Sequence, residues 1–373
     1  MATISQYTPK MVSHPGQTLG YKIQELGMSV KEFAIRASKP EKTIIAVIKG
    51  DSSITPDMAV AFENVTKIPA HFWMARQRKY DEAIARERME VKIAESIEWA
   101  NMFPLSCMTK YGWIEKVKEK SEKVKTILQF FALSSSDAWH NYYMNQQLKV
   151  AFRISLSSTK EPYAVSAWLR QGDIQAESLT VKEDFSEKLL REKLIEMKQL
   201  MAEKPENWHI ILQSICASCG IKLVYTQPLP KAPINGATRW LSGKYPIIQM
   251  SGRHKRYDIF WFSFFHEIGH LLLHGKKDIF LENIEYDDKV QVKEKEADDF
   301  ASKIVLSKEE EEEIITKRAY SPADIKRYAQ KFRTHHSIIV GRLQHNKKIP
   351  YTYDSQLLDK IDLFSNQSSV ILE

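Results

Sequence analysis

The sequence predicts a mostly helical α+β protein, and three stretches of its 373 residues lead to this prediction. Residues 15 to about 80 carry a close succession of helix start and stop signals. The run from Phe260 to His274 is apolar enough to form a helix buried on nearly all sides. Three short segments with strand-like composition precede that run. We therefore expect an N-terminal helical domain, and a C-terminal domain in which a small sheet packs on one buried helix.

The N-terminal segment is predicted to form five short helices joined by tight turns. The signals place them at about Pro15–Leu26, Ser29–Ser38 and Glu41–Lys49, with the last two starting at Thr55 and Ile68. Ser29-Val-Lys-Glu32 is a capping box, and Gly50 closes the third helix. Very few residues join the second helix to the third, which is typical of a helix-turn-helix.

The charge of this segment points to duplex DNA as a partner. Residues 1–80 contain eleven Lys or Arg against six Asp or Glu. Such an excess favours contact with phosphates. The predicted recognition helix and its flank offer a small set of residues to DNA: Lys39, Lys42, Thr43 and Lys49. On the same helix, Glu41 would repel phosphate unless it reads a cytosine amino group, and Ile45 would have to meet a thymine methyl group or a protein.

The middle of the chain is rich in charged residues and helix formers. It has helical runs at Lys120–Phe131 and Ser186–Ala202, and its chemistry is not disclosed by the sequence. We expect four segments: a helix-turn-helix domain (1–82), a helical connector (83–200), a metal-binding domain (201–350) and a loosely held tail (351–373).

The predicted strands are Ile221–Thr226, Ala237–Leu241 and Tyr245–Met250. Proline cannot donate to a ladder of backbone hydrogen bonds, so Pro246 favours an edge position for the last of them. An exposed edge strand can pair with an extended peptide. The expected substrate-binding residues are Tyr245, Ile247, Ile248 and Met250.

The buried helix contains the motif H-E-x-x-H as His266-Glu267-Ile268-Gly269-His270. Residues four apart lie on one face of a helix, so both imidazoles can bind one metal ion. Two imidazoles, a carboxylate and an open position suit Zn²⁺. Glu267 lies one position round the helix, where it can accept a proton from water as a general base. A chance match is less plausible here, since polar groups in such an apolar helix need partners.

A third zinc ligand is expected from the helix predicted over Lys293–Val305, whose apolar face includes Ala297 and Ala301. Glu294 and Glu296 flank this face on opposite sides, and periodicity slightly prefers Glu294. His274 is a third contender, although its place before Gly275 is more typical of a helix end.

These motifs resemble two known families. His-Glu-Ile-Gly-His-Leu-Leu-Leu-His (266–274), followed by Glu-Lys-Glu-Ala-Asp-Asp-Phe-Ala (294–301), is similar to the ImmA/IrrE metallopeptidases. That family is of the gluzincin type, with a Glu as third zinc ligand and a zincin-like fold. The Glu directly before Ala matches the family's ligand position, so the resemblance implies Glu296. This chain has Val305-Leu306-Ser307 where the family usually has a Leu-Met-Pro-like end.

The N-terminal segment resembles the HigA-like branch of the Xre-type helix-turn-helix family. The residues that carry this resemblance are His14-Pro-Gly16, Gly27-Met-Ser29, Gly50, Ile54-Thr-Pro56 and Ile68-Pro-Ala-His-Phe-Trp73.

Composition adds limits on location and partners. The net charge of +7 permits a polyanionic partner without requiring one. The chain has no run of eighteen apolar residues, and its first residues lack a signal-peptide core, so we expect a cytoplasmic protein without a membrane partner. Three cysteines fit a reducing compartment. Cys216 and Cys219 have C-x-x-C spacing, but no second C-x-x-C follows. Both lie in a helix-like run, so we interpret them as core residues.

Two functions follow from these predictions, and a third, a small-molecule hydrolase, is less favoured because the expected edge strand suits a peptide. The first is a transcriptional regulator that binds operator DNA, as a homodimer, and carries a zinc metallo-endopeptidase. The ImmA/IrrE resemblance implies that such a peptidase cuts a helix-turn-helix repressor in a stress, phage or toxin-antitoxin response. The alternative is a non-catalytic HigA-like antitoxin that neutralises a toxin protein and represses its own operon. Glu267 favours the first, because a scaffold has no need of a base.

Overall fold

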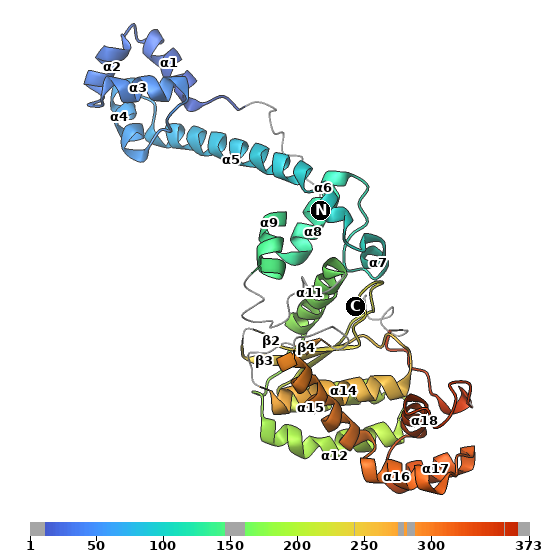
Figure 1. Ribbon diagram of the computed structural model, residues 1–373. Coiled ribbons are helices and arrows are strands. Elements are labelled where there is room, and N and C mark those ends of the chain that lie inside the picture. Colours follow the sequence, from blue (N-terminus) through green and yellow to red (C-terminus); the bar gives the residue numbers. More distant parts are fainter. Residues whose placement is uncertain are drawn as a thin grey trace. The chain divides into compact units, whose positions relative to one another are not determined.

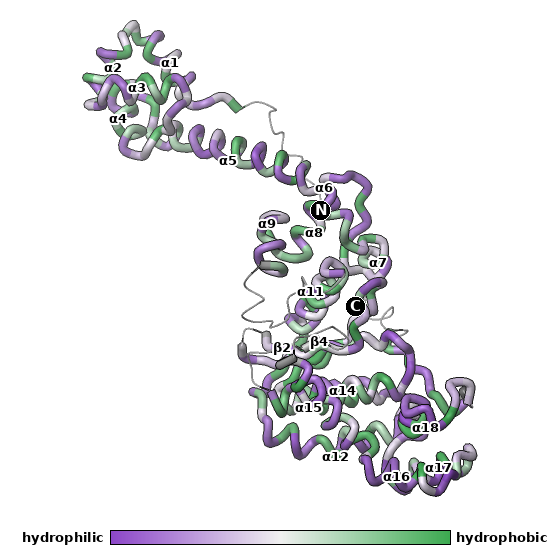
Figure 2. Tube along the Cα trace, in the orientation of Figure 1, coloured by the Kyte–Doolittle hydropathy of each residue, from purple (hydrophilic) through white to green (hydrophobic). Residues whose placement is uncertain are grey.

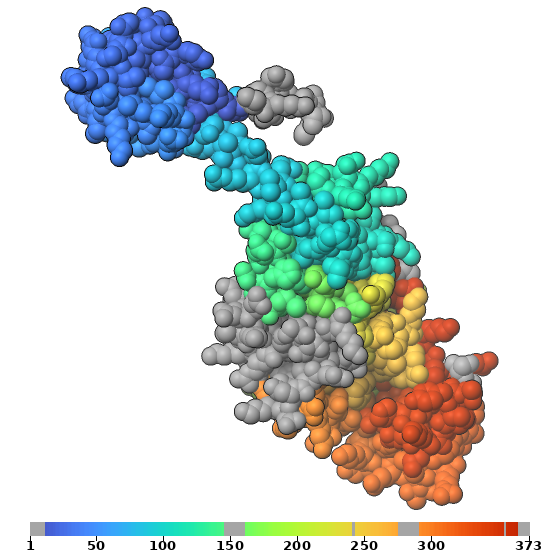
Figure 3. All heavy atoms as spheres, turned by 45° about the horizontal axis from the view of Figure 1, so that its top comes forward, coloured from blue at the N-terminus to red at the C-terminus, as the bar shows by residue number. Residues whose placement is uncertain are grey.

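The computed structural model describes residues 12–145, 161–241, 243–274, 280–281, 288–353 and 355–364. The chain divides into two compact units, the first ending at Glu95 and the second beginning at Ser96 (Figure 3). The described residues are mostly helical, and a four-stranded sheet lies in the second unit, so the predicted fold class is confirmed (Figure 1).

The helices of the first unit begin and end close to the predicted positions. They are α1 (Pro15–Glu25), α2 (Val30–Arg36), α3 (Glu41–Lys49), α4 (Pro56–Thr66) and α5 (Ala70–Glu95). The side chain of Ser29 caps α2 and that of Thr55 caps α4, while Gly50 ends α3 with φ 84°. Their core is built from apolar side chains such as Phe33, Phe62 and Trp73, all fully buried.

Two local features fix this helical arrangement. A Cβ atom at Gly16 would collide with the carbonyl group of Val47, so glycine allows α1 to approach α3 closely. The helix α5, whose residues are mostly hydrophilic (Figure 2), continues without interruption through the expected boundary at residue 82. The division between the units therefore falls later, after Glu95.

The second unit begins with helices that the sequence analysis assigned to a connector. They are α6 (Ile97–Asn101), α7 (Leu105–Lys110), α8 (Lys120–Phe131), α9 (Ser136–Trp139), the π-helix η1 (His140–Asn145), α11 (Pro162–Ser178) and α12 (Glu187–Glu203). They belong to the same compact unit as the sheet and the helices that follow it.

The remaining helices follow the sheet or lie next to it in the chain. They are α13 (Trp208–Ser218), α14 (Tyr257–Leu273), α15 (Asp288–Val305), α16 (Lys308–Lys317), α17 (Pro322–Phe332), α18 (His336–His345) and the 3₁₀-helix η3 (Ser355–Leu357). Ser307, which stands where the resembling family has its Leu-Met-Pro-like end, forms a capping box with Glu310 and starts α16.

The sheet has the strand order β1-β3-β2-β4, and its strands are β1 (Lys222–Tyr225), β2 (Gly236–Leu241), β3 (Tyr245–Met250) and β4 (Phe280–Leu281). The predicted edge position of Tyr245–Met250 is wrong, because β3 pairs in parallel with β1 and antiparallel with β2. The ladder with β1 begins at Ile247, so Pro246 lies outside it, which explains how a central strand tolerates proline.

The two faces of β3 contact different helices (Figure 1). Ile248 and Met250 belong to the main core together with α14, whereas Ile247 packs with Ala176 of α11. Ile247, Ile248 and Met250 are buried core residues, whereas Tyr245, the first residue of β3, is half-buried.

The C-terminal segment also differs from its prediction. Leu357, Ile361 and Leu363 are buried in the main core, so residues 355–364 do not form a loosely held tail. Residues 365–373 lie outside the described residues.

Candidate metal centre

The H-E-x-x-H motif lies on α14, which packs side by side with α15 (Figure 1). As predicted, most of α14 is buried, from Tyr257 to Leu272. Gly269, inside the motif, brings the two helices close: a Cβ atom there would lie 3.2 Å from the Cα of Ala297. The side chains of α15 can therefore reach the histidines of α14.

The carboxylate that meets the two histidines belongs to Glu294. Its Oε2 lies 3.2 Å from Nε2 of His266, and its Oε1 lies 3.5 Å from Nε2 of His270. The two Nε2 atoms are 2.9 Å apart. We call these three residues the α14 cluster; one ligand atom from each lies within 4.8 Å of the others.

These spacings fit a tetrahedral metal ion. Zinc binds imidazole nitrogen and carboxylate oxygen at about 2.0–2.2 Å, which places neighbouring ligand atoms of a tetrahedral site roughly 3.3 Å apart. The distances in the α14 cluster, 2.9 to 3.5 Å, lie on both sides of this value.

The outer nitrogens of the histidines settle which ring atoms carry lone pairs. Nδ1 of His266 lies 2.9 Å from Oδ1 of Asp298. A carboxylate only accepts hydrogen bonds, so this Nδ1 carries a proton, and in the neutral form of the ring the lone pair is then on Nε2. Asp298 is four residues after Glu294 on the same face of α15. The sequence analysis missed it, although that spacing could have revealed it.

A longer chain of hydrogen bonds has the same effect on His270. Nε2 of His274 lies 2.9 Å from Oε2 of Glu296, so this nitrogen donates to the carboxylate. Nδ1 of His274 then accepts from Nδ1 of His270, at 3.0 Å, and the lone pair of His270 is on Nε2. With both rings neutral, two lone pairs and the carboxylate of Glu294 converge, and a metal ion between them would be stabilised, so the α14 cluster is a candidate metal site.

Electrostatics also keeps His270 neutral. Burial lowers the pKa of His270 far below its ordinary value, with His266, His274 and Lys293 acting in the same direction. A neutral imidazole is the form that binds metal.

Glu296 was the expected third ligand, and the structure does not bring it to the histidine pair. Its side chain points to His274 and is 55% exposed, whereas that of Glu294 is 18% exposed. His274, another contender, is the C-cap residue of α14 and contacts His270 through Nδ1. The weak preference of periodicity for Glu294 agrees with the geometry, and the position taken from the resemblance does not.

Glu267 is fully buried beside the sheet. A Cβ atom at Gly236 of β2 would lie 2.7 Å from its Oε1, so glycine leaves room for this carboxylate. The hydroxyl of Thr238, also on β2, donates to the backbone oxygen of Glu267 at 3.3 Å. The edge strand next to this part of β2 is β4, which pairs with Ala237 and Thr238.

A second group of histidines lies at the start of α18. We call His335, His336 and Asp359 the α18 cluster; their ligand atoms also lie within 4.8 Å of one another. Nδ1 of His335 accepts from the backbone N–H of Ser337 at 3.2 Å, so Nε2 of the neutral ring carries the proton. That nitrogen lies 3.6 Å from Asp359, which also pairs with Lys204. A protonated nitrogen and an ammonium group leave little place for a metal ion.

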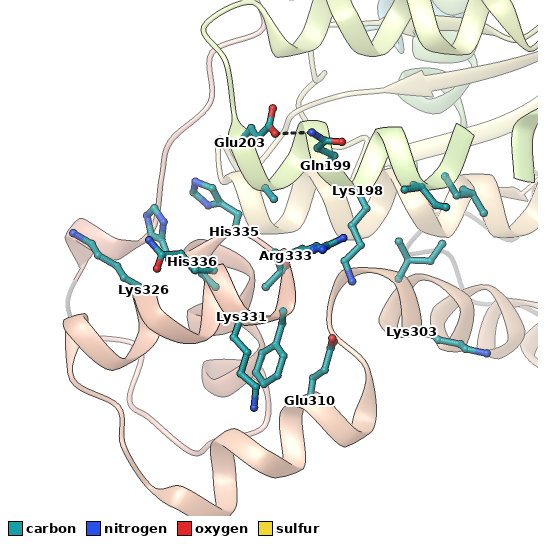
Figure 4. A pocket seen from close by; sticks show the side chains of 18 residues that line it. Lys198, Gln199, Glu203, Lys303, Glu310, Lys326, Lys331, Arg333, His335 and His336 are labelled. Atoms are coloured by element: carbon teal, nitrogen blue, oxygen red, sulfur yellow. Dashed lines mark hydrogen bonds between the residues drawn. The ribbon is translucent and has the colours of Figure 1, made fainter. Parts of the chain in front are cut away.

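His335 and His336 of the α18 cluster line a cavity of about 1070 Å³ whose other charged side chains are mostly positive (Figure 4). Lys198 of α12 and Arg333 at the end of α17 extend toward one another there. This charge also disfavours a cation.

The expected DNA-contacting residues lie on or beside α3. Lys42 and Lys49 are exposed, and Thr43 is half-buried. Lys39 forms an ion pair with Asp57, so its charge is partly compensated. Ile44 and Val47 face the core, which leaves Lys42, Ile45 and Lys49 on the outer side of the helix.

Cys216 and Cys219 are both buried, and neither forms a disulfide bond, in agreement with their interpretation as core residues. Within the described ranges, no helix is long and apolar enough to cross a membrane.

Two solved structures are similar to part of this chain. One is an addiction module antidote protein of a HigA family from Coxiella burnetii, with 28% identity over 22% of this chain and 92% of its own, and a TM-score of 0.22. The other is described as an antidote protein of a plasmid maintenance system from Nostoc punctiforme PCC 73102, with 28% identity over 20% of this chain and 84% of its own, and a TM-score of 0.20. A comparison with curated proteins gives no match.

The family comparison concerns the metal centre directly. Residues 219–343 match the Peptidase_M78 family, described as the IrrE N-terminal-like domain. The match spans α14 and α15 with both histidines and Glu294, and it confirms the family predicted for this part of the chain. Residues 219–343 are thus an IrrE N-terminal-like domain.

Proposed function

We propose that the second unit is a zinc-dependent endopeptidase whose metal ligands are His266, His270 and Glu294. The observation that carries this proposal is the convergence of two imidazole lone pairs and a carboxylate beside a fully buried Glu267. A bound zinc ion supplies the Lewis acidity that polarises a carbonyl group and acidifies water.

The residues of this chain have separate tasks in that reaction. Glu267 would accept a proton from the attacking water at its carboxylate and afterwards deliver it to the leaving amine. Asp298 orients His266, and Glu296 orients His270 through His274. The backbone of an extended substrate would pair with β4, the edge strand that lies beside the part of β2 in contact with Glu267.

We further propose that the first unit binds operator DNA as a homodimer, with α3 in the major groove. The net positive charge of residues 1–80 and the exposed Lys42 and Lys49 support this proposal. The protein would then be a cytoplasmic regulator. Its substrate would be a helix-turn-helix repressor, with a toxin protein as the other possible partner.

Cleavage by the zinc-loaded full chain tests the peptidase directly. Wild type and Glu267→Gln are incubated with neighbouring repressors and with the protein itself, and fragments are read on a gel. The variant should keep zinc and lose roughly two to four decades in rate, as expected for a positioned proton-transfer group. Equal cleavage by both excludes Glu267 as the base. Zinc-loaded protein that cuts nothing supports the non-catalytic antitoxin instead.

DNA binding has its own test, a shift assay with DNA from upstream of the gene at several salt concentrations. Lys42→Ala should weaken binding several-fold and reduce the salt slope by about one. Lys188→Ala, an exposed lysine of α12, serves as the control and should change nothing. Absence of binding by wild type at low salt would count against a DNA-binding role.

A further inference from the structure

A cavity of about 400 Å³ lies between α14, α15 and α18, next to the α14 cluster. Ser263 lines it and precedes His266 by three residues, which corresponds to about 4.5 Å along a helix. Asp298 also lines it and holds the outer nitrogen of His266. The cavity therefore begins one helical turn from the proposed metal ligands, in the groove between the helices that carry them.

Most of the cavity wall is apolar. Ile259 and Phe262 come from α14, Val305 from α15 and Ile338 from α18. A volume of this size holds an amino-acid side chain with room to spare. An apolar wall alone would select only for size.

One hydrogen-bond donor in this wall has no acceptor among the described residues. Nη2 of Arg342 is buried and has no hydrogen-bond partner among the described residues. The other guanidinium group of the wall, that of Arg256, is satisfied by Asp258 at 2.7 and 3.0 Å. Asp298 is already engaged with His266. A buried N–H group without an acceptor is unfavourable, so a ligand that brings an acceptor is stabilised here.

The surroundings hold Arg342 in this position. Its guanidinium carbon lies 5.9 Å from the ring centre of Phe262. A Cβ atom at the neighbouring Gly341 would collide with the carboxylate of Asp258, so glycine lets α18 approach α14 closely. The guanidinium group of Arg342 on α18 thus lies against Phe262 of α14.

We propose that this cavity binds a carboxylate of the peptide substrate through Arg342, close to the scissile bond. The proposal rests on the peptidase function above. A guanidinium group pairs with a carboxylate through hydrogen bonds, and the unpaired Nη2 of Arg342 can donate one of them. Asp258 and Asp298 in the same wall repel a dianionic phosphate more strongly than a singly charged carboxylate.

Two parts of a peptide carry this group, an acidic side chain and the C-terminal carboxylate. Three tripeptides distinguish them: acetyl-Leu-Glu-Leu-amide, acetyl-Leu-Gln-Leu-amide and acetyl-Leu-Gln-Leu with a free C-terminus. The test measures their dissociation constants by titration calorimetry with the zinc-loaded full chain carrying Glu267→Gln, which prevents cleavage during the measurement.

A carboxylate peptide should bind about tenfold more tightly than the neutral amide, as expected for a charged hydrogen bond. Adding Arg342→Gln should abolish this difference. Arg342→Lys, which keeps the charge and loses the fork, should keep part of it. Lys198→Gln, in the other cavity, should preserve it entirely. Circular dichroism checks the fold of each variant.

Equal binding of the three peptides, no binding by any of them, or a preference that survives Arg342→Gln would overturn the proposal. A carboxylate preference in a protein that cleaves nothing would contradict the peptidase and leave the binding site in place. Cleavage without a carboxylate preference would support the peptidase and contradict the carboxylate-binding site. Failure of the one proposal can therefore be told from failure of the other.

Discussion

The α14 cluster and the α18 cluster each place two histidines beside one carboxylate, yet their ring nitrogens are engaged in opposite ways. In the α14 cluster the outer nitrogens donate, to Asp298 and through His274 to Glu296, and the inner lone pairs face each other. In the α18 cluster, Nδ1 of His335 accepts from the backbone and its other nitrogen carries the proton.

This difference separates a metal site from a structural network. Judged only by residue type and by the distances between ligand atoms, both clusters could hold a metal ion. The hydrogen bond made by the second nitrogen of each ring decides whether the first can bind a metal ion. The α18 cluster instead links Lys204 at the end of α12, the start of α18 and Asp359.

The largest expected contrast is in metal affinity. His270→Ala should weaken zinc binding by about a hundredfold or more, because apparent zinc-binding free energies of roughly 10–16 kcal/mol are shared among three or four ligands. His336→Ala, in the α18 cluster, should leave the affinity unchanged. Competition with a chromophoric chelator measures both. Weaker zinc binding by His336→Ala would contradict the claim that the α18 cluster does not hold the metal ion.

A smaller effect should separate the two glutamates of α15. Glu294→Ala removes a ligand and should act like His270→Ala, whereas Glu296→Ala acts through His274 and should cost about tenfold to a hundredfold. The same chelator competition decides between them. Full affinity in Glu294→Ala together with complete loss in Glu296→Ala would restore Glu296 as the ligand.

The smallest expected effect is on the stability of the protein in acid, and it tests whether His335 of the α18 cluster is neutral. Burial, with His336 beside it, lowers the pKa of His335 to about 3. The unfolded chain binds this proton below an ordinary pKa of about 6.5 and the folded chain does not. The free energy of unfolding should therefore fall as the pH drops from about 6.5 toward 3, by up to roughly 1.4 kcal/mol per pH unit.

His335→Asn isolates this contribution, because asparagine still caps α18 and does not titrate. Urea unfolding in the presence of a chelator, between pH 8 and pH 5, compares the two proteins without bound metal. The variant should be less stable at pH 8, where it lacks the ring contacts with Tyr257 and His336, and should lose stability less steeply below pH 6.5. Identical slopes would contradict a neutral His335.

Features that depend on neighbouring residues were predictable from the sequence. The capping side chains of Ser29 and Thr55, the glycine that ends α3, and the buried character of α14 all follow from a few consecutive residues. The H-E-x-x-H motif is equally local, since helical pitch alone brings His266 and His270 together.

Features that depend on distant segments were not predictable from the sequence. The central place of β3 arises from parallel pairing with β1, about twenty-five residues earlier, which the composition of one strand does not encode. The choice between Glu294 and Glu296 depends on how α15 rotates against α14, and the close approach at Gly269 fixes that rotation. The burial of Leu357 and Ile361 likewise requires the finished core.

Anomalous diffraction at the zinc absorption edge, from crystals of the zinc-loaded full chain, tests the central claim most directly. The account predicts a peak bonded to Nε2 of His266, Nε2 of His270 and the carboxylate of Glu294, each at about 2.0–2.2 Å. A peak held by Glu296 or His274 in place of Glu294, or one located in the α18 cluster alone, would contradict it.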